Sequence, residues 1–281
     1  MVVGAPWRRR AVLGARYGVL LAGAGVMIAP FLYMLATSFK QQALLFEIPP
    51  QFIPKHGTLQ NYADAWHSNN FGRYFLNSVI IAVLTTVLSV WLSSMMAYAF
   101  ARFRFPGQRL LFALLLVGLI VPAIMLIIPQ FLLAKQLGLI DSRAGLVVFY
   151  VGTTLALNTF LLRGFFEGIP HELEEAMVVD GAGAFRRYWQ LILPLSRPAL
   201  ATVTIFSFLA SWDEFAWALT IINTPSRRTL PIAIALFQGQ YLTSWNIVFA
   251  ASMIAIVPVI VVFLVFQRQF VSGLTSGAVR G

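Results

Sequence analysis

Asp213 and Glu214 are neighbouring acids inside an apolar run that reads SWDEFAW from position 211. A charge in a membrane-spanning helix costs roughly 3 kcal/mol unless it faces water or a partner. One acid could therefore line a polar solute path beside Trp212 or Trp217, or it could form a structural hydrogen bond to a neighbouring helix. Because adjacent helical residues point in different directions, we do not expect both acids to serve one role. Asn158, within another apolar run, has the same two interpretations.

Other chemistry finds little support in the sequence. The glycine-rich stretch at Gly181–Gly183 lacks the Gly-Lys-Ser/Thr that follows in a phosphate-binding loop. His56, His67 and His171 are scattered without metal-ligand spacing, and a serine nucleophile elbow is absent. With no cysteine in the chain, disulfide and thiol chemistry are excluded. The sequence therefore predicts no catalytic residue, no metal site and no cofactor.

A polar insert at 170–194, PHELEEAMVVDGAGAFRRYWQLILP, interrupts the second half of the chain. It holds four of the ten acidic residues within nine positions. Pro170 suits the start of a helix, and Gly181 suits its end, where a chain reverses through a left-handed residue. A second helical run is expected over 185–192, ending near Pro194.

The first helix of this insert has a narrow, largely apolar face. Leu173, Ala176, Met177 and Asp180 recur at spacings of three and four residues. The alternative interpretation is that the insert is a solvated loop without a partner. In that case its apolar face would be exposed to water. A helix that lays its apolar face in a groove is a common recognition mode. We therefore expect the insert to dock on another protein.

The composition predicts an all-α, polytopic membrane protein. Of 281 residues, 59% are hydrophobic and 11% are charged, against roughly 25% charged in soluble domains. Apolar runs long enough to cross a bilayer follow one another along the chain. The first run is too long for the core of a cleaved signal peptide, the competing interpretation. Six spans are expected at about 17–38, 76–100, 110–133, 145–162, 196–220 and 246–266.

These spans give a simple domain organisation. A terminus (1–16) precedes the first span, a loop (39–75) follows it, and a five-helix core (76–266) leads to a tail (267–281). Pro122 and Pro129 predict a kink in the third span.

Basic residues predict the orientation. Thirteen of the twenty Lys and Arg lie in both termini, the 102–109 turn and the 163–197 segment, and seven lie in the opposite loops. Because positive residues stay inside, both termini and the insert are expected in the cytoplasm. The net charge of +10 is explained by this bias rather than by nucleic-acid binding.

At the insert the chain resembles the membrane subunits of bacterial ABC importers. Their signature is Glu-Ala-Ala, three residues, Gly, nine residues, Ile, one residue and Leu-Pro. Here it reads Glu175-Ala176-Met177, Gly181, Leu191 and Leu193-Pro194, so Met and Leu replace one Ala and the Ile. Further stretches are similar to maltose-type carbohydrate permeases, in particular their shorter, six-span partner: 77–78, 97–99, 102–107, 162–166 and 273–279.

This resemblance implies a type I ABC importer permease fold in the bacterial inner membrane. The chain would be non-catalytic, and its insert would be a coupling helix seated on a cytoplasmic ATPase. Partners would be a second permease, two ATP-binding subunits and an external sugar-binding protein. The seat would involve Glu172, Leu173, Glu175, Ala176, Met177, Asp180, Gly181, Leu193 and Pro194. Further ATPase contact would come from the tail, at Gly273, Leu274, Thr275 and Gly277.

Three alternatives to a sugar importer stay open. Close relatives carry glycerol 3-phosphate or another polyol on the same architecture. Alternatively, Asp213 or Glu214 could couple a secondary carrier to an ion gradient, and a membrane scaffold would show no solute dependence. In relatives the fifth-span motif usually reads Trp-Asn-Glu-Phe, so Asp213 stands in the Asn place.

Overall fold

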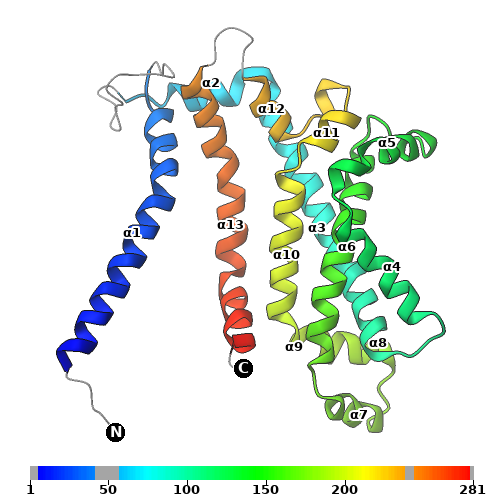
Figure 1. Ribbon diagram of the computed structural model, residues 1–281. Helices are drawn as coiled ribbons and strands as arrows, with labels where there is room; N and C mark the ends of the chain where they lie inside the picture. The colour runs from blue at the N-terminus through cyan, green and yellow to red at the C-terminus, as the bar shows by residue number, and fades with distance from the viewer. Residues whose placement is uncertain (1–5, 42–56, 238–243, 279–281) are drawn as a thin grey trace. The chain divides into compact units, whose positions relative to one another are not determined.

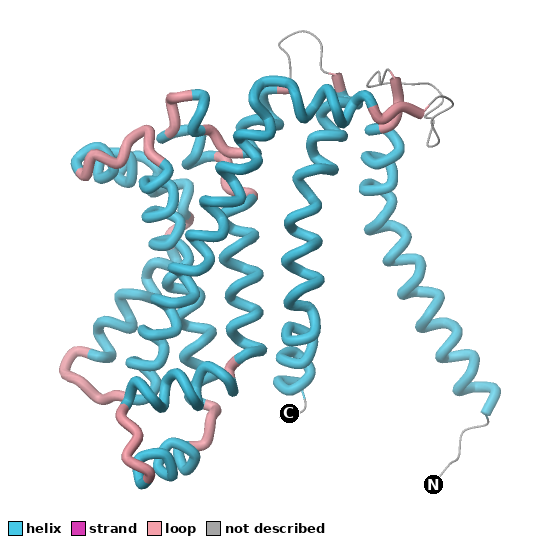
Figure 2. Tube along the Cα trace, turned by 180° about the vertical axis from the view of Figure 1, so that it is seen from behind, coloured by secondary structure: helices cyan, strands magenta, loops and turns pink. Residues whose placement is uncertain are grey.

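The computed structural model describes residues 6–41, 57–237 and 244–278, and within them every regular element is a helix (Figure 1; Figure 2). Four helices are long and apolar enough to cross a membrane, and two bent helix pairs raise this number to six. The predicted fold class is confirmed. The helices are α1 (Pro6–Ser38), α2 (Gln60–His67), η1 (Ser68–Asn70), α3 (Phe71–Arg102), α4 (Gln108–Ile120), η2 (Ala123–Leu126), α5 (Ile127–Gln136), α6 (Arg143–Glu167), α7 (His171–Val179), α8 (Ala184–Arg187), η3 (Tyr188–Ile192), α9 (Leu193–Leu195), α10 (Arg197–Trp212), α11 (Ala216–Ile221), η4 (Pro225–Arg227), α12 (Leu230–Leu236) and α13 (Trp245–Ala278).

The chain forms two compact units, and the smaller comprises residues 1–68 and 236–255. Its described part is joined by Asn61 on α2. The Asn61 side-chain amide donates to the carbonyls of Ser38 (2.8 Å) and Lys40 (2.7 Å). Its oxygen accepts from Asn246 Nδ2 at 2.8 Å. This buried amide therefore ties the end of α1 to the start of α13.

The larger unit, residues 69–235 and 256–281, has α3 at its centre, packed mainly against α6 and α10. Buried hydroxyl side chains on α3 allow a close approach to α6, because small residues let helix backbones come together. Ser89 and Thr154 share a hydrogen bond of 2.7 Å across this contact. The buried serines and threonines of α3 are Ser78, Thr85, Thr86, Ser89, Ser93 and Ser94.

Two hydrophobic clusters hold the larger unit together. One lies around Leu146, Trp217 and Ile221, at the end that carries α5 and α11. The other lies around Leu162, Phe166 and Ile192, at the end that carries α7 and α8 (Figure 1). The two candidate sites described below sit beside these two clusters.

The third and fifth expected spans are bent, and this corrects two predicted ranges. The 110–133 range divides into α4 and α5, which meet at 99° where Pro122 follows the end of α4. The kink expected at Pro122 is therefore a break between two helices, and its angle is much larger than that of a bent but continuous helix. The 196–220 range is not one helix either, because α10 ends at Trp212 and α11 begins at Ala216.

The ends of two other predicted ranges also differ from the structure. Residues 184–195 are helical and meet α10 at 81°, just before Pro198. Leu193 N–H donates to Tyr188 O, a π-type turn that precedes Pro194, which has no N–H of its own. The last helix, α13, continues past the expected end of the sixth span at 266 and reaches Ala278.

Candidate functional site

The insert folds as predicted into a helix, a tight reversal and a second helical run. Pro170 is the N-cap of α7, one residue before the helix, and Glu172 and Glu174 occupy its first turn, where the helix dipole favours acids. Gly181 has a φ of +76°, so the expected left-handed residue is present. Its N–H donates to Val178 O at 2.9 Å, and Ala182 N–H donates to Met177 O at 2.8 Å. These bonds satisfy carbonyls at the end of α7.

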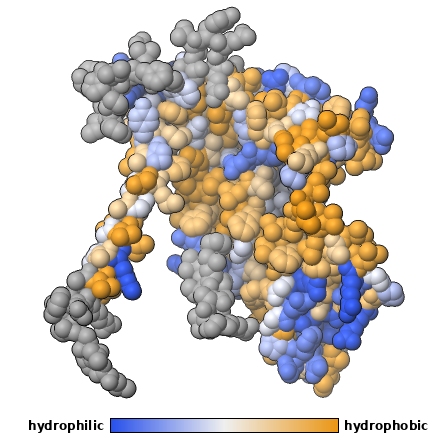
Figure 3. All heavy atoms as spheres, in the orientation of Figure 1, coloured by the Kyte–Doolittle hydropathy of each residue, from blue (hydrophilic) through white to orange (hydrophobic). Residues whose placement is uncertain are grey.

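The outer surface of the insert carries exposed apolar side chains among polar ones. Leu173 is 44% exposed and Val179 87% exposed, and Ala176 between them is also exposed. Phe185 and Trp189 of the second helical run are 69% and 50% exposed. In Figure 3 hydrophilic and hydrophobic atoms mix at the end of the larger unit that carries α7 and α8. Nothing in the described chain covers these side chains, as the docking prediction requires.

The other predicted seat residues divide into two groups. Glu172, Glu175, Asp180, Gly181 and Pro194 are exposed beside the apolar side chains. Met177 and Leu193 are half-buried, and Leu193 packs against the cluster around Leu162 instead of facing outward. For the tail residues Gly273, Leu274, Thr275 and Gly277, the structure describes only that their backbone belongs to α13.

Glu174 is a functional candidate that sequence reasoning missed. Although three acids surround it in the sequence, it alone is buried, at 4% exposure. Its Oε1 lies 2.5 Å from Arg102 Nε, at the last residue of α3. Its Oε2 lies 3.8 Å from Arg187 Nη1 and accepts from the Tyr98 hydroxyl at 3.5 Å. The available signal was the helical spacing, because Glu174 points away from the face that holds Leu173 and Ala176.

A second candidate site lies where the chain breaks between α10 and α11. Glu214 Oε1 accepts from Trp217 N–H at 2.7 Å, and its Oε2 accepts from Ala218 N–H at 3.0 Å. Tyr150 of α6 donates its hydroxyl to the same Oε2 at 2.7 Å. The carboxylate thus satisfies two of the first three N–H groups of α11, which explains why a new helix begins here.

Glu214 and Trp217 also line a cavity of about 100 Å³. Its polar lining comes from Gln130, Tyr150, Thr153 and Glu214, and its aromatic lining comes from Phe149 and Trp217. The Phe149 and Trp217 rings are 4.7 Å apart. Polar groups that converge on an aromatic wall are typical of a site that binds a polar small molecule.

The remaining residues of the predicted path lie elsewhere. Asp213 is exposed at the end of α10, and Trp212 is buried against Phe208, with the two rings stacked at 5.5 Å. Asn158 is 1% exposed and donates to Ser207 Oγ at 2.7 Å, which joins α6 to α10. The geometry of Asn158 therefore matches the structural alternative considered for it, whereas Glu214 and Trp217 come together at the cavity.

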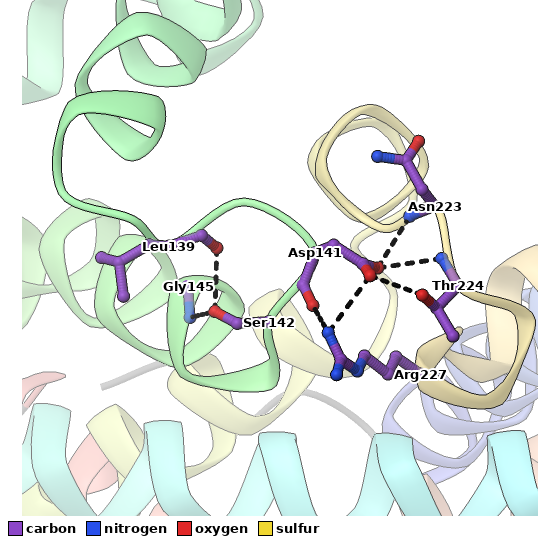
Figure 4. Close-up of polar contacts among 7 residues, drawn as sticks. All are labelled: Leu139, Asp141, Ser142, Gly145, Asn223, Thr224 and Arg227. Atoms are coloured by element: carbon purple, nitrogen blue, oxygen red, sulfur yellow. Dashed lines mark hydrogen bonds and ion pairs between the residues drawn. The ribbon is translucent and has the colours of Figure 1, made fainter.

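Asp141 fastens the loops beside this cavity (Figure 4). Its Oδ1 accepts from the N–H groups of Asn223 (3.0 Å) and Thr224 (2.9 Å), and its Oδ2 accepts from the Thr224 hydroxyl (2.5 Å). Arg227 donates to both the carbonyl and the carboxylate of Asp141. Asp141 adopts a left-handed φ of +53°, which an aspartate tolerates better than most residues. The link joins the α5–α6 loop to the segment after α11.

These contacts predict an acid-sensitive stability. The bonds from Thr224, and then that from Asn223 and the Arg227 charge, hold the pKa of Asp141 below its ordinary value of 3.8. A lowered folded-state pKa contributes stability that is complete above pH 4 and is lost as the pH falls through the folded-state pKa. We expect Asp141→Asn to flatten the fall in melting temperature as the pH drops below about 4. An unchanged acid slope in the purified variant would contradict this role.

The described residues contain no group of three His, Asp or Glu side chains arranged to hold a metal ion. The charged clusters around Glu174 and Asp141 are instead neutralised by arginines.

Residues 89–276 match the family model described as "Binding-protein-dependent transport system inner membrane component". The chain is 36% identical to the diacetylchitobiose uptake system permease protein NgcG of Streptomyces coelicolor, over 94% of this chain and 88% of that protein. It is also 36% identical to the trehalose transport system permease protein SugB of Mycobacterium tuberculosis, over 97% and 99%.

A solved structure is similar over the same extent. It is a chain of a bacterial ABC transporter involved in the import of the acidic polysaccharide alginate. The similarity has a TM-score of 0.80 with 27% sequence identity, and it covers 94% of this chain and 98% of that one.

Proposed function

Because this chain belongs to the family of binding-protein-dependent transport system inner membrane components, we propose that it is a permease subunit of an ATP-driven carbohydrate importer. The single observation that carries the coupling role is the uncovered apolar face of α7. A face formed by Leu173 and Ala176 on a short polar insert needs a protein partner, because water would otherwise surround it. The relatives named above transport diacetylchitobiose, trehalose and alginate, which supports a saccharide as the solute.

In this proposal the chain hydrolyses nothing itself. Two cytoplasmic ATP-binding subunits supply the energy, and one of them receives the insert, including Glu175 and Gly181. A second permease completes the path as a heterodimer, and an external binding protein delivers the sugar. The excess of Lys and Arg in the termini and the insert supports a cytoplasmic location for all three. The tail residues 273–277 make a further contact with the ATPase.

The solute path passes the cavity beside Glu214. A saccharide offers hydroxyl groups to Gln130, Tyr150 and Thr153 and an apolar ring face to Trp217. At about 100 Å³ the cavity is smaller than a typical ligand pocket of roughly 300 Å³ or more, so it contacts part of a sugar rather than enclosing it. Such partial contact suits a path, where binding must be weak enough to allow release.

Filling the cavity should block the path. Thr153 lines it and is exposed, so Thr153→Trp would occupy the space with an indole ring. We expect sugar uptake by the assembled importer to fall on the order of tenfold, while its ATP-binding subunits still copurify. Val148→Trp places the same ring on an exposed position of α6 outside the cavity lining and serves as the control. Normal uptake by Thr153→Trp would show that this cavity is not part of the solute path.

The function itself is tested in proteoliposomes that contain the permease pair and its ATP-binding subunits. We expect uptake of a labelled oligosaccharide only with both ATP and the binding protein. Uptake of glycerol 3-phosphate or another polyol in place of sugars would change the proposed substrate class but would leave the proposed importer architecture unchanged. Uptake that survives without ATP but collapses with the proton gradient would reject the proposal in favour of an ion-coupled carrier.

A further inference from the structure

The last two turns of α3 present three polar side chains to the insert. Ser94, Tyr98 and Arg102 are spaced four residues apart, so they lie along one face of the helix. All three make hydrogen bonds to residues between 169 and 188. The end of α3 therefore holds the insert by a row of polar contacts in addition to hydrophobic packing.

Arg102 holds the first half of the insert. Its Nη2 donates to Ile169 O at 2.7 Å, just before α7 begins. Its Nη1 lies 3.2 Å from His171 Nε2, and its Nε lies 2.5 Å from Glu174 Oε1. One guanidinium thus contacts the entry to α7 and the first turn of α7.

The second half of the insert is tied to the same face of α3. The Tyr98 hydroxyl donates to Ala184 O at 3.3 Å, at the start of α8. The Tyr188 hydroxyl shares a hydrogen bond of 2.6 Å with Ser94 Oγ. Arg187 completes the group by its approach to Glu174 Oε2.

Burial makes the Arg102–Glu174 pair hard to separate. The side chains of Arg102 and Glu174 are only 4% and 6% exposed. Breaking the ion pair while the site stays closed, or removing one partner, would leave a charge buried and uncompensated, which is strongly unfavourable. By contrast, the exposed pair Arg163–Glu167 at the end of α6 is 28% and 46% exposed, and water would replace that contact at little cost.

We propose that the Arg102–Glu174 pair is the mechanical link by which a displacement of the docked α7 moves α3. The proposal rests on the importer function proposed above. Since α3 packs along α6, a displacement of its end reaches the helix that carries Tyr150 and Thr153. Glu174 and Arg102 are positioning residues in this scheme, because the partner contacts the outer face of α7 and not this pair.

The test is the ratio of sugar molecules taken up to ATP hydrolysed, measured on the assembled importer in proteoliposomes. We expect Glu174→Gln to keep its ATP-binding subunits and to lower this ratio on the order of tenfold, within the usual range of coupling between sites. Glu167→Gln, which breaks the exposed pair, should leave the ratio unchanged. A purely structural role for Glu174 would reduce uptake and hydrolysis together and leave the ratio as in wild type.

A second variant decides the matter even if Glu174→Gln fails to assemble. The chain has no cysteine, so Arg102→Cys with Glu174→Cys introduces two unique thiols in it. We expect a low ratio before treatment and recovery after joining the thiols with a short bis-methanethiosulfonate, with the single-cysteine variants as controls. A ratio that stays low after cross-linking, or is normal before it, would overturn the link. If the wild-type assembly shows no ATP-driven uptake at all, the importer function itself fails instead.

Discussion

Gly181→Pro is expected to lower ATP-driven uptake on the order of 100-fold. The chain should still insert into the membrane and pair with its partner permease. The reversal after α7 requires a φ of +76° at this position, and proline is fixed near −65°. Proline also removes the N–H that bonds to Val178 O. The cost is about 3 kcal/mol or more, so the turn must change and α7 must present its apolar face in another direction. Uptake and ATP hydrolysis in proteoliposomes measure the effect.

The matched control for this reversal is two residues away. Gly183 has a φ of −68°, and a Cβ there would have no neighbour within 4 Å. Gly183→Ala should therefore transport normally. A Cβ at Gly181 also meets open space, so Gly181→Ala tests the backbone conformation alone and should give an intermediate loss. Wild-type uptake by Gly181→Pro would reject the insert as the coupling element.

Glu214→Ala is expected to produce the second large effect, a combined loss of stability and uptake. The substitution leaves three donors without their acceptor: the N–H groups of Trp217 and Ala218 and the hydroxyl of Tyr150. Hydrogen bonds to a charged group contribute about 1.5–3 kcal/mol each, and buried donors left unpaired are costly. We expect the free energy of unfolding to fall by about 3 kcal/mol or more. Thermal unfolding in detergent and sugar uptake measure the two consequences.

The neighbouring acid supplies the control for Glu214. Asp213→Ala changes an exposed carboxylate at the end of α10 and should alter stability by no more than about 0.5 kcal/mol. Tyr150→Phe removes one of the three donors and should fall between the two variants. Equal losses of stability and uptake in Glu214→Ala and Asp213→Ala would contradict the role given to the hydrogen bonds of Glu214.

The sequence predicted the features that depend on local pattern. The apolar runs predicted the spanning helices, and the three- and four-residue spacing around Leu173 predicted the exposed face of α7. Gly181 was placed correctly because a helix end that reverses the chain has few other solutions. These inferences depend only on residues that are close to one another in the sequence.

The features that the sequence did not predict depend on distant partners. Glu174 has the same side chain as Glu172 and Glu175, and its burial depends on Arg102 and Tyr98 of α3 and on Arg187. Asp141 lies in a short loop, and its partners are more than 80 positions away. The break after Trp212 could not be read from hydropathy, because a carboxylate that caps its own chain replaces the missing helical bonds.

The hydroxyl residues buried along α3 have a consequence for motion. Serine and threonine form shallow ridges, so α3 and α6 interlock less deeply at Ser89 and Thr154 than helices that meet through leucine or phenylalanine. A small shift of α3 along α6 would therefore force few large side chains into new rotamers at this contact. The centre of the larger unit thus meets through small hydroxyl side chains, whereas arginine–carboxylate pairs at Glu174 and Asp141 hold its two ends.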